Sequence, residues 1–142
     1  MRIYLDNCCF NRPFDNQTQV KIRLETEAKL YIQQEIINGR YDLVWSYILE
    51  FENKMNPFIT RRKAILEWKT KTVTDIEENE SILKIAEEFQ NRGIKSKDAL
   101  HIACAIEANS EYFITTDKKL LNFISNDIKI VNPIEFINEM ED

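Results

Sequence analysis

Glycine and proline are scarce in this chain, which has two glycines and three prolines among its 142 residues. Interdomain linkers and low-complexity tracts are rich in such residues, so we expect neither, and no segment repeats another. The length suits one domain with one core, and a hydrophobic content of 44% is ordinary for a globular protein. The composition therefore predicts a single domain over residues 1–142.

Long hydrophobic runs are also missing. The apolar runs are only a few residues long, whereas a membrane-spanning helix needs roughly 20. The segment Met1-Arg2-Ile3 enters a predicted strand directly, without the apolar core of a signal peptide. We expect a cytoplasmic protein that makes no membrane contact.

Cysteine and histidine are too few for the common zinc and nucleophile sites. Cys8, Cys9 and Cys104 lack zinc-ligand spacing, and an odd number in a cytoplasmic protein indicates free thiols. His101 is the only histidine, and no serine or cysteine nucleophile accompanies it in a recognisable motif. Its Ala-rich surroundings favour a hydrogen-bonded core imidazole over a catalytic base.

The net charge of −5 argues against a protein that coats nucleic acid non-specifically. It does not exclude a nuclease, because an enzyme that holds phosphates through metal needs an acidic site and can place its basic residues around the rim. Local basic clusters occur at residues 61–63, at Lys95 with Lys97, and at residues 118–119. Any one cluster alone is more simply a solvated surface.

Short β-type segments alternate with helical patterns, which is typical of βαβ units. Strands are predicted over residues 3–5, 43–45, 71–73, 112–115 and 129–131. Helices are predicted over residues 21–38, 46–56, 58–68, 78–91, 97–108, 118–123 and 134–140. We therefore expect an α/β fold with a short parallel sheet of four to five strands.

Four carboxylates occupy positions that such a sheet brings together. Asp6 follows the first predicted strand and Asp117 the fourth, and ligands bind beyond the carboxyl ends of parallel strands where the connection order reverses. Asp98 begins the helix over residues 97–108, and Glu52 lies in the helix after the second strand. Crowded carboxylates repel one another unless a cation lies between them, so the arrangement predicts a Mg²⁺ or Mn²⁺ site.

Each acid also has a purely structural interpretation. Asp6 and Asp117 are suited to capping helices, Asp98 to complementing a helix dipole, and Glu52 to pairing with a surface Lys or Arg. The joint placement of the four favours a metal site over four independent coincidences.

Several motifs together resemble the PIN domain: Leu5-Asp6-Asn7, Ser46 with a downstream acid, Lys97-Asp98-Ala99-Leu100-His101-Ile102-Ala103 and Ile114-Thr115-Thr116-Asp117. Their order and intervals agree over nearly the whole chain. The resemblance implies a Rossmann-like three-layer α/β/α PIN-type fold and Mg²⁺- or Mn²⁺-dependent endonuclease action on RNA. Among PIN proteins of this size, VapC-type toxins of toxin–antitoxin pairs are the nearest in appearance.

The resemblance also assigns site residues. Asp6, Asp98 and Asp117 match the first, third and fourth acids, which hold the metal, and Thr115 matches a hydroxyl that fixes a carboxylate or contacts substrate. The residue after Asp6 is often Thr or Ser in the family and is Asn7 here. Its amide is still able to hold a carboxylate or a metal-bound water.

The second acid is ambiguous between Glu50 and Glu52. The family glutamate lies about six residues beyond the Ser or Thr that closes the second strand, here Ser46, which favours Glu52. On a helix the two side chains point about 200° apart, so only one faces the metal. Glu52 shares the face of Ile48 and Met55, which we expect to point inward.

The resemblance thus implies an endoribonuclease that hydrolyses RNA phosphodiester bonds, with a small antitoxin protein as partner and a homodimer as assembly. One alternative is a catalytically silent PIN-fold module that binds RNA or protein. Another is a phosphatase or phosphotransferase of related architecture, which usually needs an Asp-x-Asp nucleophile. Asp6-Asn7-Cys8 breaks that pattern.

Overall fold

The computed structural model describes residues 1–141, so residue 142 of the expected domain lies outside the described residues. Five strands form one parallel sheet in the order β3-β2-β1-β4-β5. The strands are β1 (Arg2–Leu5), β2 (Asp42–Ser46), β3 (Thr74–Ile76), β4 (Tyr112–Ile114) and β5 (Lys129–Val131). The expected α/β fold with a short parallel sheet is confirmed.

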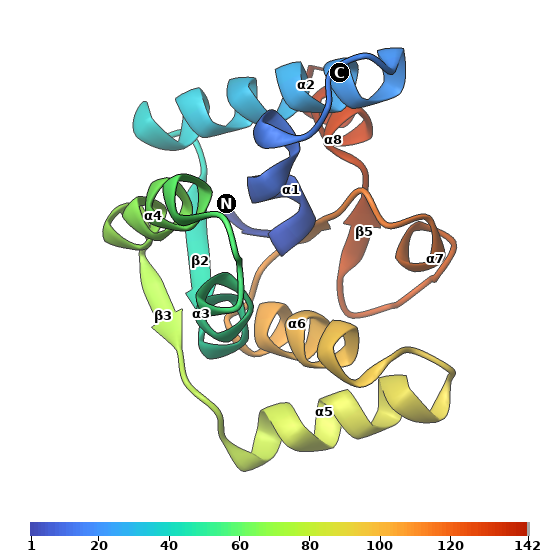
Figure 1. Cartoon of the computed structure of the whole chain (residues 1–142). Helices are drawn as coiled ribbons and strands as arrows, with labels where there is room; N and C mark the ends of the chain where they lie inside the picture. The colour runs from blue at the N-terminus through green and yellow to red at the C-terminus, as the bar shows by residue number, and fades with distance from the viewer. Residues whose placement is uncertain (142) are drawn as a thin grey trace.

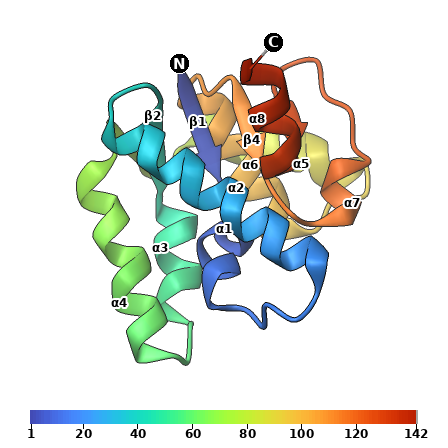
Figure 2. The ribbon, with the colours of Figure 1, turned by 90° about the horizontal axis from the view of Figure 1, so that it is seen from above.

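Helices cover both faces of the sheet, which gives three layers. Helices α2 and α8 lie on one side, and α5 and α6 lie on the other (Figure 1; Figure 2). Within residues 1–141, no helix is long and apolar enough to cross a membrane. The helices are α1 (Asn7–Asn11), α2 (Val20–Ile37), α3 (Tyr47–Lys54), α4 (Ile59–Glu67), α5 (Glu80–Asn91), α6 (Ser96–Glu107), α7 (Lys118–Leu121) and α8 (Pro133–Glu141).

The two central strands and α6 form the middle of the core. Residues 3–5 of β1 and 43–45 of β2 are fully buried, as expected for strands covered on both faces. Helix α6 presents small side chains to its neighbours, and Ala99, Ala103 and Ala105 are fully buried. A helix so enclosed places any polar side chain it carries in the interior, which is why its polar residues matter for the site.

The predicted third strand is displaced in the structure. The third strand is Thr74–Ile76 rather than 71–73, and Lys71 instead ends a short 3-10 helix, η2 (Trp68–Lys71). Pairing with β2 sets the register of this edge strand, with Val44 opposite Thr74, and Val73 is half-exposed. A run of β-branched residues indicates that a strand is near but does not fix its ends.

Helix α1 and the 3-10 helix η1 (Arg12–Phe14) that follows it were not predicted. A five-residue helix is too short to show a 3.6-residue period. It forms because Cys9 and Phe10 are both fully buried, so tertiary packing rather than local propensity stabilises it.

Candidate metal centre

The site lies where the connection order of the sheet reverses. Strand β1 is flanked by β2 on one side and by β4 on the other, so the chain leaves β1 in one direction and later returns to its opposite edge. Asp6 follows β1 directly, and its backbone N–H donates to the Ile114 carbonyl at the end of β4, at 2.9 Å. The segment Thr115–Asp117 after β4 is thereby placed beside Asp6.

The Asp6 carboxylate is held by several donors. Only 6% of the residue is exposed. The Thr115 hydroxyl donates to Oδ2 at 2.8 Å, the Asn7 N–H donates to Oδ1 at 2.8 Å, and the Cys8 thiol lies 3.5 Å from Oδ2. Thr115 also accepts from the backbone N–H of Asp117 at 3.1 Å, so one hydroxyl connects two of the predicted acids.

Glu52, not Glu50, turns toward Asp6. The Asn7 side-chain amide donates to Glu52 at 3.3 Å, whereas Glu50 pairs with Lys69 on the far side of α3. Burial raises the pKa of Glu52, but its hydrogen bond to His101 and the nearby positive charges outweigh that effect and leave the pKa lowered. The expectation that Met55 shares an inward face is wrong, because α3 ends at Lys54 and Met55 is 68% exposed.

A buried hydrogen-bond chain supports Glu52 from behind. The Nε2 atom of the fully buried His101 contacts the Glu52 carboxylate, and its Nδ1 atom lies 2.6 Å from the hydroxyl of Tyr4. That hydroxyl lies 2.6 Å from the Ser46 hydroxyl. Because a carboxylate only accepts, Nε2 is the donor whether the imidazole is neutral or charged. The chain therefore fixes the orientation of Glu52.

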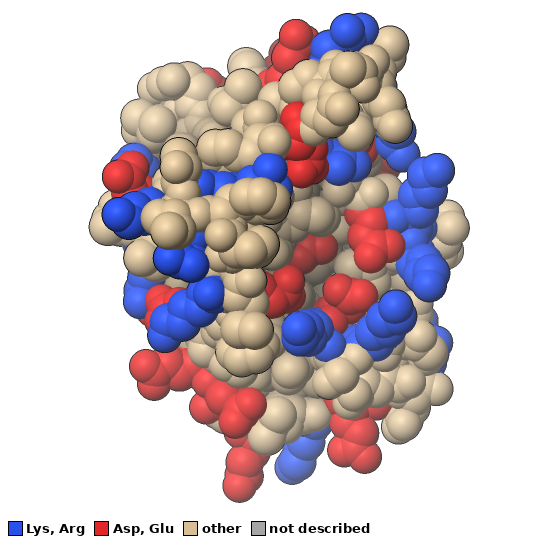
Figure 3. All heavy atoms as spheres, viewed as in Figure 1, with Lys and Arg blue, Asp and Glu red and all other residues tan. Residues whose placement is uncertain are grey.

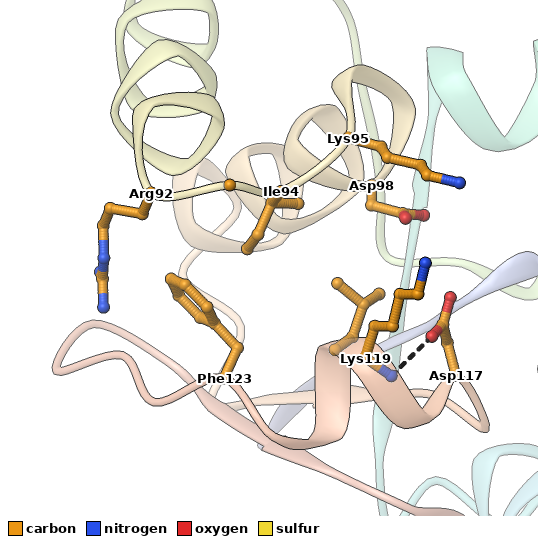
Figure 4. A pocket seen from close by; sticks show the side chains of 9 residues that line it. Arg92, Ile94, Lys95, Asp98, Asp117, Lys119 and Phe123 are labelled. Atoms are coloured by element: carbon orange, nitrogen blue, oxygen red, sulfur yellow. Dashed lines mark hydrogen bonds between the residues drawn. The ribbon is translucent and has the colours of Figure 1, made fainter.

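Asp98 and Asp117 form the more open part of the site. Asp98 lies in the first turn of α6, and burial together with the charges of Asp6 and Asp117 raises its pKa. In Figure 4 the carboxylates of Asp98 and Asp117 face each other across the mouth of a pocket, with Lys95 and Lys119 beside them. Figure 3 shows acidic side chains gathered in a hollow with basic ones around it.

Two of the structural interpretations hold alongside this placement. Asp6 accepts from the N–H of Asn7 at the start of α1, and Asp117 accepts from the N–H of Lys119 at the start of α7, at 2.9 Å. Capping and a place in the crevice are thus compatible. Glu52 differs, because its partners are His101 and Asn7 rather than a surface Lys or Arg.

The donor set suits a hard divalent cation, although the side chains do not yet enclose one. Within residues 1–141, no group of three or more His, Cys, Asp or Glu stands in a metal-holding arrangement. The Oδ1 atom of Asn7 is buried and has no hydrogen-bond partner among those residues. Carboxylate and amide oxygens are the ligands that Mg²⁺ and Mn²⁺ prefer, and carboxylates without a cation between them repel one another. The residues present therefore fit such an ion.

Sequence reasoning missed the supporting residues. His101 is a buried, hydrogen-bonded imidazole, as the sequence predicts, but it also contacts Glu52. The only signal in the sequence is that His101 lies three residues after Asp98, on the same face of α6. Nothing in the sequence marks Tyr4 as a site residue, because its neighbours in β1 are buried as well and it looks like one more core residue. Cys8, which the sequence indicates only as a free thiol, lies 3.4 Å from the Thr115 hydroxyl.

Solved structures with the same fold were found. The chain is similar to VapBC2 from Rickettsia felis bound to a promoter DNA fragment, with 14% sequence identity and a TM-score of 0.58. The match covers 93% of this chain and 98% of that one. It is similar to VapBC-1 from nontypeable Haemophilus influenzae (18% identity, 94% and 99% coverage, TM-score 0.57). It is also similar to DNA-bound VapBC from Salmonella typhimurium (13% identity, 94% and 98% coverage, TM-score 0.56).

No curated protein matches the chain. The family profile of the PIN domain matches residues 3–124, which include the four acids and Thr115. That span covers all but the last strand and helix of the fold. The chain therefore belongs to the PIN domain family.

Proposed function

We propose that this chain is an endoribonuclease that hydrolyses RNA phosphodiester bonds with the help of Mg²⁺ or Mn²⁺. Asp6, Glu52, Asp98 and Asp117 would hold the ion or ions. The observation that carries the proposal is the convergence of carboxylates from four separate segments at the carboxyl edge of β1 and β4, with lysines beside them.

When bound, a divalent ion lowers the pKa of an attacking water and offsets charge on the phosphate. The protein's own part is to position the groups. Thr115 holds Asp6 through its hydroxyl and accepts from the backbone N–H of Asp117, which places the backbone of Asp117 beside the Asp6 carboxylate. His101 aims Glu52 at the same space, where it is placed to orient the attacking water or a second ion. Lys95 and Lys119 lie where they can attract the phosphodiester backbone.

The test is incubation of the purified protein with a structured RNA, with Mn²⁺ or with EDTA, followed by analysis of the product ends. We expect cleavage only with Mn²⁺, leaving 5′ phosphate and 3′ hydroxyl ends. Asp117→Asn should lose the activity, whereas Asp127→Asn, an exposed aspartate before β5 at the opposite edge of the sheet, should retain it. Equal cutting by wild type and Asp117→Asn, or cutting in EDTA, would contradict the proposal.

We further propose that the chain is the toxin of a toxin–antitoxin pair and that it forms a homodimer. The three solved structures described above are VapBC assemblies, two of them bound to DNA, which supports a small antitoxin as partner. Large apolar side chains stand exposed on α2, among them Leu24, Tyr31 and Ile37. Light scattering after size exclusion tests the dimer, which a monomer at micromolar concentration would contradict.

The second candidate is a catalytically silent PIN-fold module that binds RNA or protein. It is favoured by one observation, that no metal-holding group of three stands ready within residues 1–141. The two candidates differ in one measurement, because only the enzyme binds Mn²⁺ through its acids. RNA binding that is unaffected by Mn²⁺, without cleavage, would favour the module.

A further inference from the structure

A pocket opens directly from the acidic crevice, and its lining beyond Asp98, Asp117, Lys95 and Lys119 has no role in the function proposed above. Its volume is about 380 Å³, within the roughly 300–1,000 Å³ range of small-ligand sites. The α5–α6 loop forms one wall and α7 with Phe123 forms the other (Figure 4). Asp98 and Asp117 stand at its mouth, so a ligand held here is continuous with the candidate metal centre.

The lining changes in character with distance from the acids. Lys95 and Lys119 lie nearest to them, and Ile94 and Phe123 line the stretch beyond (Figure 4). Leu120 also lines the pocket. The lysines present positive charge, whereas the next stretch offers an apolar surface that includes an aromatic ring. Leu120 is 3% exposed, so this surface is backed by the core and is not a loose surface patch.

Arg92 closes the far end. Its guanidinium lies over the ring of Phe123, 4.2 Å from the centroid, and donates to the carbonyl of Ile124 at 2.9 Å. These contacts, with a further one over the ring of Phe89, hold the long side chain in place, so a positive charge stands at the end of the pocket away from the acids. The pocket therefore presents charge, apolar surface and charge in sequence.

We infer that this pocket binds one nucleotide of the RNA strand, the neighbour of the scissile phosphate, with its phosphate at Lys95 and Lys119 and its base against Ile94, Leu120 and Phe123. The inference rests on the proposed function and extends it to a defined subsite. A nucleotide matches this lining because its base has flat apolar faces that stack on aromatic and aliphatic side chains, and the phosphates on either side of its ribose carry the negative charge that the cations attract. An acidic peptide would satisfy the cations but would leave the apolar stretch uncovered.

The test measures binding without cleavage. The full chain, labelled with ¹⁵N, is titrated with uridine 5′-monophosphate, adenosine 5′-monophosphate, ribose 5-phosphate and pentaglutamate, with Ca²⁺ present. We expect saturable shifts of the amide signals of Gly93, Ile94, Lys119 and Phe123 with both nucleotides. Ribose 5-phosphate, which lacks the base, should bind about 5-fold more weakly, since contacts to a base are worth about 1 kcal/mol or more.

Variants separate the two halves of the pocket. Ile94→Ser should weaken nucleotide binding about 5-fold and leave ribose 5-phosphate unchanged. The double variant Lys95→Gln with Lys119→Gln should weaken all phosphate ligands about 10-fold, whereas Lys63→Gln with Lys84→Gln, which makes the same charge change on exposed positions, should not. Equal affinity for nucleotide and ribose 5-phosphate, tighter binding of pentaglutamate, or shifts confined to other segments would overturn the inference.

The outcomes also separate this inference from the proposed function. If the chain cleaves RNA but binds no nucleotide in this pocket, the proposed function stands and the nucleotide subsite is wrong. If the chain binds nucleotides here but does not cleave RNA, the nucleotide subsite stands and the proposed catalytic function is wrong.

Discussion

The two halves of the acidic crevice are built differently. The carboxylates of Asp6 and Glu52 each accept hydrogen bonds from neighbouring side chains, namely those of Thr115, Asn7 and His101, and are called the hydrogen-bonded pair below. Asp98 and Asp117, the open pair, stand at the mouth of a pocket, and within residues 1–141 no hydrogen bond to the Asp98 carboxylate is present.

The two pairs differ in how many hydrogen-bond donors the fold supplies to their carboxylates. For the hydrogen-bonded pair, neighbouring donors stabilise the charged form and fix its direction before any ligand arrives. In the open pair, burial and then the charges of Asp6 and Asp117 raise the pKa of Asp98, so its charged form is disfavoured. We therefore expect substitutions in the first pair to weaken both fold and function, and substitution of Asp98 in the second pair to weaken function without weakening the fold.

The largest effect is expected from Asp6→Asn. RNA cleavage should fall at least about 100-fold, because replacing even the residues that orient a metal ligand costs about 10–100-fold. The free energy of unfolding should fall by about 1–2 kcal/mol, since an amide cannot accept from both Thr115 and the Asn7 N–H as the carboxylate does. Urea unfolding and initial cleavage rates measure both effects. Loss of activity with unchanged stability would remove Asp6 from the hydrogen-bonded pair.

His101→Leu tests whether the chain behind Glu52 positions it. Cleavage should fall about 10–100-fold, and Mn²⁺ should bind more weakly, because Glu52 loses the donor that orients it. His101→Gln keeps a donor and should recover part of both. Glu50→Gln, which disrupts the surface pairs with Lys69 and Lys54 and does not touch His101, serves as the control. If His101→Leu lowers stability but leaves Mn²⁺ affinity unchanged, the residue is only structural.

Lys29 extends the comparison to a buried cation. Its ammonium lies over the rings of Phe10 and Trp68, and no ion pair to it is present within residues 1–141. Burial lowers its pKa from 10.5 to about 8, although nearby Cys9 opposes the shift. Between about pH 8 and 10.5 the unfolded chain therefore binds more protons than the folded one, so stability from this group rises with pH across that window.

Lys29→Met should accordingly raise the free energy of unfolding by about 2 kcal/mol at pH 7. The gain should shrink to less than half by pH 10, where the lysine is neutral in the folded chain. Urea unfolding of both proteins at the two pH values gives the difference directly. A gain that is independent of pH would attribute the effect to packing rather than to charge.

Asp98→Asn should have the smallest effect on stability, with the opposite sign to Asp6→Asn. Removing a carboxylate that repels Asp6 and Asp117 should raise the melting temperature of the metal-free protein by about 2 °C, the shift that under 1 kcal/mol gives in a chain of this size. With saturating Mn²⁺ the wild type should become the more stable protein. Differential scanning calorimetry in EDTA and in Mn²⁺ measures both. Destabilisation in EDTA would place Asp98 with the hydrogen-bonded pair.

Much of the fold was predictable because the signals were local. The apolar runs at residues 3–5 and 43–45 predicted the central strands, and the helical pattern over residues 21–38 predicted α2, which ends just before Gly39 at φ +80°. The edge strand β3 was misplaced by three residues because pairing, not composition, sets its register.

The site was predictable only in outline. An acid after each of two strands, and another in a buried Ala-rich helix, predicts which segments converge. The link from His101 to Glu52 and Tyr4 joins residues 49 and 97 positions apart, and no local pattern encodes such a contact. The position of Cys8 beside Asp6 depends on α1, a helix whose stability comes from tertiary packing.

The most direct test of the acidic crevice is a titration with Mn²⁺ followed by electron paramagnetic resonance. The wild type should bind one or two ions saturably. Asp6→Asn and Asp117→Asn should each weaken that binding at least about tenfold, and Asp127→Asn should leave it unchanged. Absence of saturable binding by the wild type, or equal binding by all four proteins, would contradict the account.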